Sequence, residues 1–412
     1  TNNDPQKLFF SKAGDFEDMT TGTNADDGMN FTIGSDQVNA IKYLKGLRTL
    51  LIGTVGGEFV ATASTSAEPI TPTNIQIKRQ AGYGTSDVDA LLAGNRILFV
   101  QRAGKKVREL VFDFDSDGYI APDLTLLAEH IAGSGVGTGF TNWTYQQEPD
   151  SIVWVVRSDG VLTGMTYQRG ENVVAWHRHI LGGAFSSGNA VVESVAAISN
   201  SLASSKGEDS LYMIVKRTIN GGTKRYVEVM QPFDFADDVE DAWFLDSALQ
   251  YSGGATTSLS GLDHLEGQTV SILANGSTHP DKVVSSGAIT LDRSVTKATV
   301  GLKYTSALQT MRIESGSADG SAQGKVKRIQ EITARFFQTV GAEIGSSSTS
   351  TDLIPFRDSS MAMDTAVELF TGDKQIEFNA DYETDGFIYI QQQQPLPMTI
   401  TAMYPQLNTY DG

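Results

Sequence analysis

The stretch that decides the fold is LKGLRTLLIG at residues 44–53, because its pattern returns as LAGNRILFVQ at residues 92–101. A leucine, a glycine, an arginine and a second glycine recur 48 residues later, at 44/92, 46/94, 48/96 and 56/104. Strand–turn–strand patterns follow at 152–167, around Asp159-Gly160, and at 211–230, around Asn220-Gly221. A period of about fifty residues predicts β-propeller blades, and a two-sheet sandwich with coincidental hairpin spacing is the alternative.

Strand patterns also dominate outside the repeat. Short runs of Val, Ile, Phe and Tyr alternate with glycine turns, and the chain contains 41 glycines. The best helix candidate runs from Asp123 to Ile131, with Leu124, Leu127 and Ile131 on one face. We therefore expect an all-β protein with a β-propeller-like main body and a smaller inserted β-barrel or sandwich domain.

Changes in composition suggest the domain boundaries. Acidic residues crowd 234–246, a Gly/Ser/Thr stretch at 252–261 predicts a loop, and 315–324 predicts a linker. We expect a propeller-like domain at 1–235, a small barrel or sandwich at 236–310 and a C-terminal β module at 311–412. The last strands of that module either form a third unit or return to the main body.

Charge and composition narrow the function classes. The formal net charge is −18, which disfavours tight DNA binding but suits a conduit that must not retain phosphate. With no cysteine, disulfides, thiolate metal sites and Cys nucleophiles are excluded. No apolar run reaches bilayer length, so no membrane span is expected. The chain opens at Thr1 inside a patterned segment, which suggests a missing N-terminal portion.

Two patterns resemble metal sites. Asp113, Asp115 and Asp117 alternate before Gly118, as in a calcium loop, but Leu124 stands where the loop's bidentate Glu should be. The alternative is a strand whose carboxylates lie on its solvent-exposed face and which ends in an Asp-Gly turn.

His177 and His179 share a face if they lie on a strand, and no third ligand is evident nearby. The alternative is that Trp176 packs inward and the histidines lie at a surface or subunit contact. We expect no bound metal and no cofactor.

Catalytic patterns are scarce, and only one cluster is basic. No nucleophile elbow of the Gly-x-Ser-x-Gly type occurs, while a glycosidase carboxylate pair stays open in so acidic a chain. Lys325, Lys327 and Arg328, with Arg335 further on, predict a strand with cations on one face. These residues are candidates for nucleic-acid or subunit contact, with a solvated face as the alternative.

Four stretches carry a family resemblance. The first is LFFSKAGDF at residues 8–16, and the second is residues 107–131, which contain DGY at 117–119 and DLT at 123–125. The third is residues 154–179, which contain AWHR at 175–178, and the fourth is residues 320–329, which contain QG at 323–324. They resemble the tail nozzle family of short-tailed bacteriophages, also called tail tubular protein B, and the related tail hub and packaged-DNA stabilisation proteins. The resemblance implies a propeller-based ring, usually sixfold, that lies beneath the portal and adaptor and has no catalytic residues.

The function expected from these observations is structural and non-enzymatic. The chain would belong to a virion, assembled in the host cytoplasm, as part of a nozzle or hub that conducts or retains DNA. Its partners would be further copies in a homo-oligomeric ring, portal or adaptor proteins, tail fibre or tip proteins, and passing DNA. The alternative is a virion-associated carbohydrate-active enzyme or a receptor-binding tail protein.

Overall fold

Antiparallel sheets make up most of the computed structural model, which describes residues 3–34, 39–65, 68–135, 137–199, 207–233, 235, 238–314, 321–363 and 365–410. Within these ranges the helical segments are short 3₁₀ turns, η1 (Glu129–Ala132), η2 (Arg169–Glu171), η3 (Val239–Asp241) and η4 (Asp263–Leu265). No helix of the described residues is long and apolar enough to cross a bilayer. The predicted all-β fold is confirmed.

The chain divides into two compact units. Unit 1 comprises Thr1–His179, Val191–Val215 and Val227–Met230, and unit 2 comprises Ile180–Ala190, Lys216–Tyr226 and Gln231–Gly412. The three-part division expected from the sequence stays a prediction. Residues 234, 236 and 237 of the acidic run and residues 315–320 of the expected linker lie outside the described residues.

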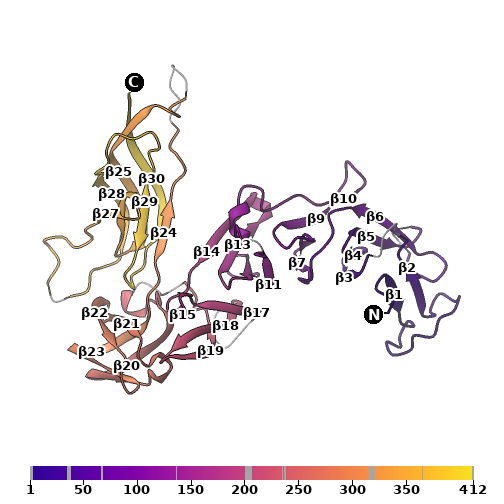
Figure 1. The fold of residues 1–412 in the computed structure, drawn as a ribbon, viewed down its shortest axis with the longest axis horizontal. Coiled ribbons are helices and arrows are strands. Elements are labelled where there is room, and N and C mark those ends of the chain that lie inside the picture. The colour runs from indigo at the N-terminus through magenta and orange to yellow at the C-terminus, as the bar shows by residue number, and fades with distance from the viewer. Residues whose placement is uncertain are drawn as a thin grey trace. The chain divides into compact units, whose positions relative to one another are not determined.

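Unit 1 is built from consecutive antiparallel meanders (Figure 1). Its strands, two of which cross the division between units, are β1 (Lys7–Phe10), β2 (Met29–Thr32), β3 (Ile41–Gly46), β4 (Leu50–Thr54), β5 (Gly57–Thr62), β6 (Gln76–Ala81), β7 (Leu91–Ala93), β8 (Arg96–Val100), β9 (Val107–Asp113), β10 (Gly118–Ile120), β11 (Phe140–Gln146), β12 (Ile152–Arg157), β13 (Leu162–Gln168), β14 (Val173–His179), β17 (Val191–Ile198), β18 (Ser210–Ile219) and β19 (Gly222–Val229). They pair as β1–β2, β3–β4–β5–β6, β7–β8–β9–β10, β11–β12–β13–β14 and β17–β18–β19.

The repeat seen in the sequence corresponds to these sheets. β3, β7, β11 and β17 begin at residues 41, 91, 140 and 191, at intervals of 50, 49 and 51 residues. Gly94, Gly104 and Gly160 lie in turns with φ of 62°, 76° and 83°, whereas Gly46 is the last residue of β3. Because propeller blades are four-stranded antiparallel sheets in series, the main body is propeller-like.

The middle sheets of unit 1 are buried on both faces. On β4, Ile52 packs in a core shared with β1 and β2, while its neighbour Leu51 packs in the next core with Ile97 of β8. Leu98, adjacent to Ile97, packs in a third core with residues of β11–β13. Successive side chains of a strand point to opposite faces, so a sheet covered on both sides reads as an unbroken apolar run. Such runs made the repeat visible in the sequence.

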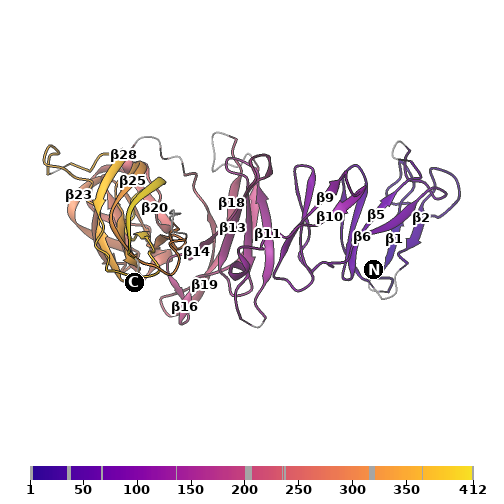
Figure 2. The same cartoon turned by 90° about the horizontal axis from the view of Figure 1, so that it is seen from above.

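Unit 2 contains a small sheet with its own core and a C-terminal group of sheets. Its remaining strands are β15 (Ala184–Phe185), β16 (Gly188–Asn189), β20 (Asp246–Ser260), β21 (Thr269–Ala274), β22 (Ser277–Val283), β23 (Ala288–Leu302), β24 (Ser306–Gln309), β25 (Val326–Thr339), β26 (Glu343–Ser347), β27 (Ser350–Leu353), β28 (Phe370–Glu377), β29 (Tyr389–Gln392) and β30 (Ile400–Tyr410). They pair as β15–β16, β20–β23–β21–β22, β24–β29–β26–β27 and β28–β25–β30. Figure 2 shows β25 and β28 side by side.

Two local predictions are wrong. The expected helix from Asp123 to Ile131 is a series of turns that ends in η1, because the Asp123 carboxylate accepts the N–H and the hydroxyl of Thr125 (2.8 and 2.6 Å) and forms an Asx-turn. The expected loop from Ser252 to Gly261 belongs largely to β20, which pairs with β23 through several bulges. In both places the hydrogen bonds that the segment forms determine its secondary structure more than its local sequence pattern does.

Candidate functional site

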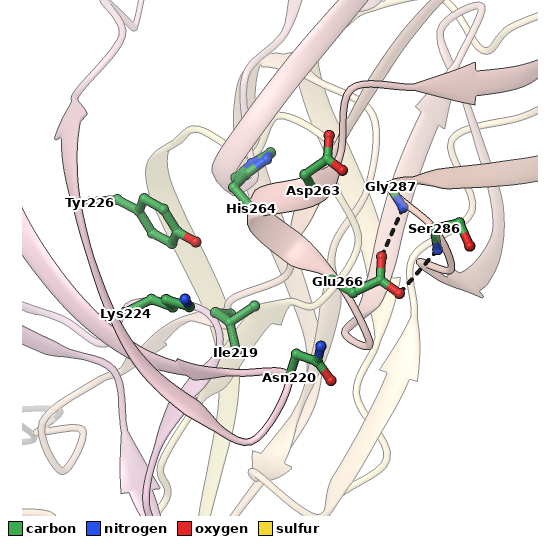
Figure 3. Close-up of a pocket in the computed structure, with 9 residues that line it drawn as sticks. All are labelled: Ile219, Asn220, Lys224, Tyr226, Asp263, His264, Glu266, Ser286 and Gly287. Carbon is green, nitrogen blue, oxygen red and sulfur yellow. Dashed lines mark hydrogen bonds between the residues drawn. The ribbon is translucent and has the colours of Figure 1, made fainter.

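A cleft in unit 2 is the best candidate for binding a small ligand (Figure 3). It lies between the tip of the β18–β19 hairpin, η4 and the turn that joins β22 to β23, and its volume of about 530 Å³ is typical of small-molecule sites. Its lining residues are Ile219, Asn220, Lys224, Tyr226, Asp263, His264, Glu266, Ser286 and Gly287. Figure 3 shows Lys224 and Tyr226 on one strand, across the hollow from Glu266.

The acidic wall of the cleft is fixed by the backbone of the β22–β23 turn. The Glu266 carboxylate accepts the N–H groups of Ser286 (3.0 Å) and Gly287 (2.8 Å). Gly287 has a φ of +66°, and a Cβ there would lie 2.5 Å from an oxygen of Asp263, so the turn requires glycine. Two carboxylates are therefore held on one side of the hollow.

The opposite wall depends on the aromatic pair of Tyr226 and His264. Their rings meet edge to face, with centroids 6.1 Å apart and an interplanar angle of 89°. His264 Nε2 lies 2.9 Å from the carbonyl oxygen of Ser247, which orients the imidazole. Within the described residues, neither the Tyr226 hydroxyl nor the Lys224 ammonium has a hydrogen-bond or ion-pair partner. The cleft thus offers an ammonium, a phenol and two carboxylates to a polar ligand.

Unit 1 has a hollow of a different character. Its volume is about 480 Å³, and leucines 124, 126 and 127 line it together with Trp176. Leu127, which the helix prediction placed on the buried face, is 96% exposed. Trp176 is half-buried: its ring stacks on Phe140 and its indole N–H donates to the carbonyl of Leu124 (2.9 Å). The lining of this hollow is mostly apolar, with Asp123, His130 and Arg169 as its polar members.

A buried ion cluster joins the β7–β10 sheet to η2, the turn between β13 and β14. Glu109 of β9 is fully buried and forms an ion pair with Arg96 of β8. Arg169 of η2 places Nε 2.9 Å from the other carboxylate oxygen, out of line for a straight hydrogen bond. The negative field of Glu109 and burial together raise the pKa of Tyr167, with burial as the larger cause. The two arginines thus provide partners for the buried carboxylate of Glu109 inside unit 1.

A second buried carboxyl group, that of Glu58 on β5, forms no ion pair with the described residues. Glu58 is fully buried, and burial raises its pKa to about 7. It accepts the backbone N–H of Tyr83 at 3.3 Å, and the Thr85 hydroxyl lies 3.5 Å away. Nearby, burial raises the pKa of Tyr43, whose hydroxyl has no partner within the described structure. Glu58 titrates near neutral pH inside the protein.

The two histidines singled out in the sequence do lie on one face of a strand. His177 Nδ1 and His179 Nε2 are 2.7 Å apart, which is a hydrogen-bond distance and leaves no room for a shared metal ion. Burial lowers the pKa of both, that of His179 to about 4. Trp154 is 3% exposed and packs against both imidazoles. The position of the His177 ring requires a glycine at residue 164, since a Cβ on Gly164 would lie 2.1 Å from that ring.

The calcium candidate does not assemble into a ligand cluster. Asp113 ends β9, and its carboxylate accepts the N–H of Ser116 (3.0 Å), while Asp115 and Asp117 are exposed in the β9–β10 turn. Within the described residues, no group of three His, Asp or Glu side chains is placed to hold a metal ion. The observed hairpin matches the alternative of a strand followed by an Asp-Gly turn.

The basic cluster at the start of β25 is not one cationic face. Lys327 is fully buried, and its ammonium donates to the carbonyl of Ile313 (3.2 Å). Its side chain is therefore not exposed for contact with DNA or another subunit. Lys325 and Arg328 are half-buried, and the Arg328 guanidinium lies over the ring of Tyr382. Successive strand residues point to opposite faces, which separates Lys327 from Arg328. DNA or subunit contact by Lys325 and Arg328 stays a prediction.

The cleft and the buried carboxyl groups were not found from the sequence. The flagged Asn220-Gly221 turn lies at the cleft, but its partners Asp263 and Glu266 come from a distant segment. A better signal existed for the buried groups, since Glu58 and Glu109 each interrupt an apolar strand.

Comparisons with known proteins do not assign the chain to a family. No family model and no curated protein matches the chain. One similar solved structure is the crystal structure of a protein from Lactobacillus plantarum, a structural genomics target, with 9% identity and a TM-score of 0.22. It covers 71% of this chain and 99% of its own. At that TM-score the fold assignment rests on the chain's own sheets.

Proposed function

We propose that this chain is a structural protein of a bacteriophage tail, part of a ring-shaped nozzle or hub that conducts or retains DNA. The observation that carries the proposal is the series of stacked antiparallel sheets at intervals of 50, 49 and 51 residues. Two of the stretches that resemble the nozzle family fall on this series, at β9–β10 with η1 and at β12–β14, and a third begins in β1, which precedes the series. Sheets packed on both faces give a stiff framework, which suits an assembly part.

The charge of the chain supports a conduit. The net charge of −18 repels phosphate, and Lys327, one of the three basic candidates for DNA contact, is buried. A wall that carries few available cations neutralises few phosphates, so duplex DNA passes without being held.

The decisive experiment measures the native mass by light scattering over a series of protein concentrations, followed by electron microscopy of the same sample. We expect a closed ring of several copies with a central channel. A chain that stays monomeric at every concentration would contradict the ring.

A second experiment tests the DNA part of the proposal. Lys325→Glu with Arg328→Glu should change DNA affinity little, as should the control Lys303→Glu, because few phosphates are neutralised in the first place. Strongly salt-dependent, submicromolar binding that the double variant alone abolishes would identify a DNA-gripping protein instead.

The alternative of a carbohydrate-active or receptor-binding tail protein has one observation in its favour. The unit 2 cleft places Asp263 and Glu266 on one wall, opposite Tyr226. Glu266 already accepts two backbone N–H groups, which ties it to the turn. Glycan hydrolysis by the isolated protein that Asp263→Asn abolishes would favour this alternative over the conduit.

A further inference from the structure

The chain contains two Asn-Gly pairs, and they form turns of the same geometry. Asn220-Gly221 joins β18 to β19 with φ of 47° and 71°, and Asn275-Gly276 joins β21 to β22 with φ of 47° and 69°. Positive φ at both positions is the mark of a type I′ hairpin turn. The pairs are matched in sequence and backbone, so any difference in their chemistry must come from their surroundings.

The surroundings of Asn275 lock its side chain. Its amide oxygen accepts the N–H groups of Thr296 (3.1 Å) and Lys297 (3.0 Å). Gly276 is buried, and a Cβ placed on it would lie 3.0 Å from the side chain of Ala366. Both the amide and the following glycine are therefore held in place.

The surroundings of Asn220 are open. Both Asn220 and Gly221 are exposed, and no atom lies within 4 Å of a Cβ placed on Gly221. Within the described residues, the Asn220 side chain has no hydrogen-bond partner. No contact within the described part of the chain therefore holds the side-chain amide or covers the glycine that follows it.

We infer that Asn220 is a site of spontaneous modification, at which the native protein loses ammonia and gains a carboxylate. The backbone nitrogen of Gly221 attacks Cγ of Asn220, and the new bond closes a five-membered succinimide. The side-chain nitrogen leaves as ammonia and takes the amide proton. Water then opens the ring: breaking the bond from nitrogen to Cγ gives aspartate, and breaking the bond from nitrogen to the backbone carbonyl carbon gives isoaspartate. The reaction consumes only water.

Glycine is what makes attack at this position easy. It has no Cβ to block approach of its nitrogen to the neighbouring side chain. Orientation of the two reacting atoms controls the rate of such a ring closure. The exposed Asn220 side chain is free to rotate into the required orientation, whereas the amide of Asn275 must first break its hydrogen bonds.

The modification changes the unit 2 cleft. Asn220 lines the same hollow as Asp263, Glu266 and Lys224, so its conversion adds a third carboxylate to the cleft. The isoaspartate product also lengthens the backbone of the β18–β19 turn. An aged population of the protein therefore has a more acidic cleft than a freshly made one.

The test follows both asparagines in the same wild-type sample. Folded protein is incubated at mildly alkaline pH and digested with trypsin, which releases Asn220 in the peptide from Thr218 to Lys224. Mass spectrometry detects the mass gain from replacing an amide by an acid, and an isoaspartyl methyltransferase assay detects the rearranged product. We expect conversion at Asn220 while Asn275 remains an amide.

The matched control is the same incubation in concentrated urea, where the protection of Asn275 is lost and the two sites should convert at similar rates. Asn220→Asp supplies the reference peptide for the product. The inference is overturned if Asn275 converts as fast as Asn220 in the folded protein. It is equally overturned if Asn220 converts in urea but not in the folded state.

Discussion

Replacing Glu58 by glutamine tests the charge state of a carboxyl group buried in β5. Glutamine keeps the size of the side chain and an oxygen that accepts the Tyr83 N–H, but it cannot ionise. Burial raises the pKa of Glu58 to about 7, from its ordinary value of 4.5. The variant therefore removes one titration from the folded state and little else.

The size and sign of the effect follow from the pKa shift. Between pH 4.5 and about 7 the folded state keeps a proton that the unfolded state has released, so the free energy of unfolding decreases as the pH rises. A shift of this size corresponds to about 3 kcal/mol. That loss is complete above pH 7, and the stability contributed by Glu58 is then constant.

His179 acts in the opposite direction over nearly the same range. Burial lowers its pKa to about 4, from 6.5, so the unfolded state takes up a proton first and stability decreases as the pH falls through this window. The two groups partly cancel in the wild-type protein. Only the difference between the wild type and Glu58→Gln isolates the carboxyl group.

The assay is urea unfolding followed by the tryptophan fluorescence of unit 1, at about pH 5 and about pH 8. We expect the variant to be more stable than the wild type by about 1 kcal/mol at the lower pH and by about 3 kcal/mol at the higher pH. An equal difference at both values would refute the raised pKa.

Three further predictions concern packing and charge. Glu109→Ala should lower the free energy of unfolding by about 3 kcal/mol, measured by the same urea titration, because it leaves two arginines without their shared carboxylate. Gly164→Ala should cost about 1–3 kcal/mol, since its Cβ would overlap the His177 ring, whereas Gly170→Ala has open space and should show a smaller loss. In a filter-binding assay, the wild-type protein should bind duplex DNA weakly and lose that binding at moderate salt, because it neutralises few phosphates.

The repeat was predictable from the sequence because of how the sheets pack. Strands such as β8 read as continuous apolar runs, since their two faces enter two different cores. The strand spacing and the glycine turns followed from those runs. β20 was missed because its Gly, Ser and Thr residues have no such pattern, and its pairing depends on β23, a strand more than twenty-five residues further along the chain.

Two buried glutamates show why the chemistry of a site, unlike the repeat, could not be predicted from the sequence. Glu58 and Glu109 each lie on the third strand of a sheet, and each is fully buried. Glu109 forms ion pairs with arginines, including Arg169 some sixty residues away, whereas the partners of Glu58 among the described residues are backbone N–H groups and the Thr85 hydroxyl. Identical residue types at the same place in two similar sheets therefore meet different partners. A charged residue within an apolar strand can be recognised from the sequence, but the partners that it meets are decided by segments that the fold brings to it.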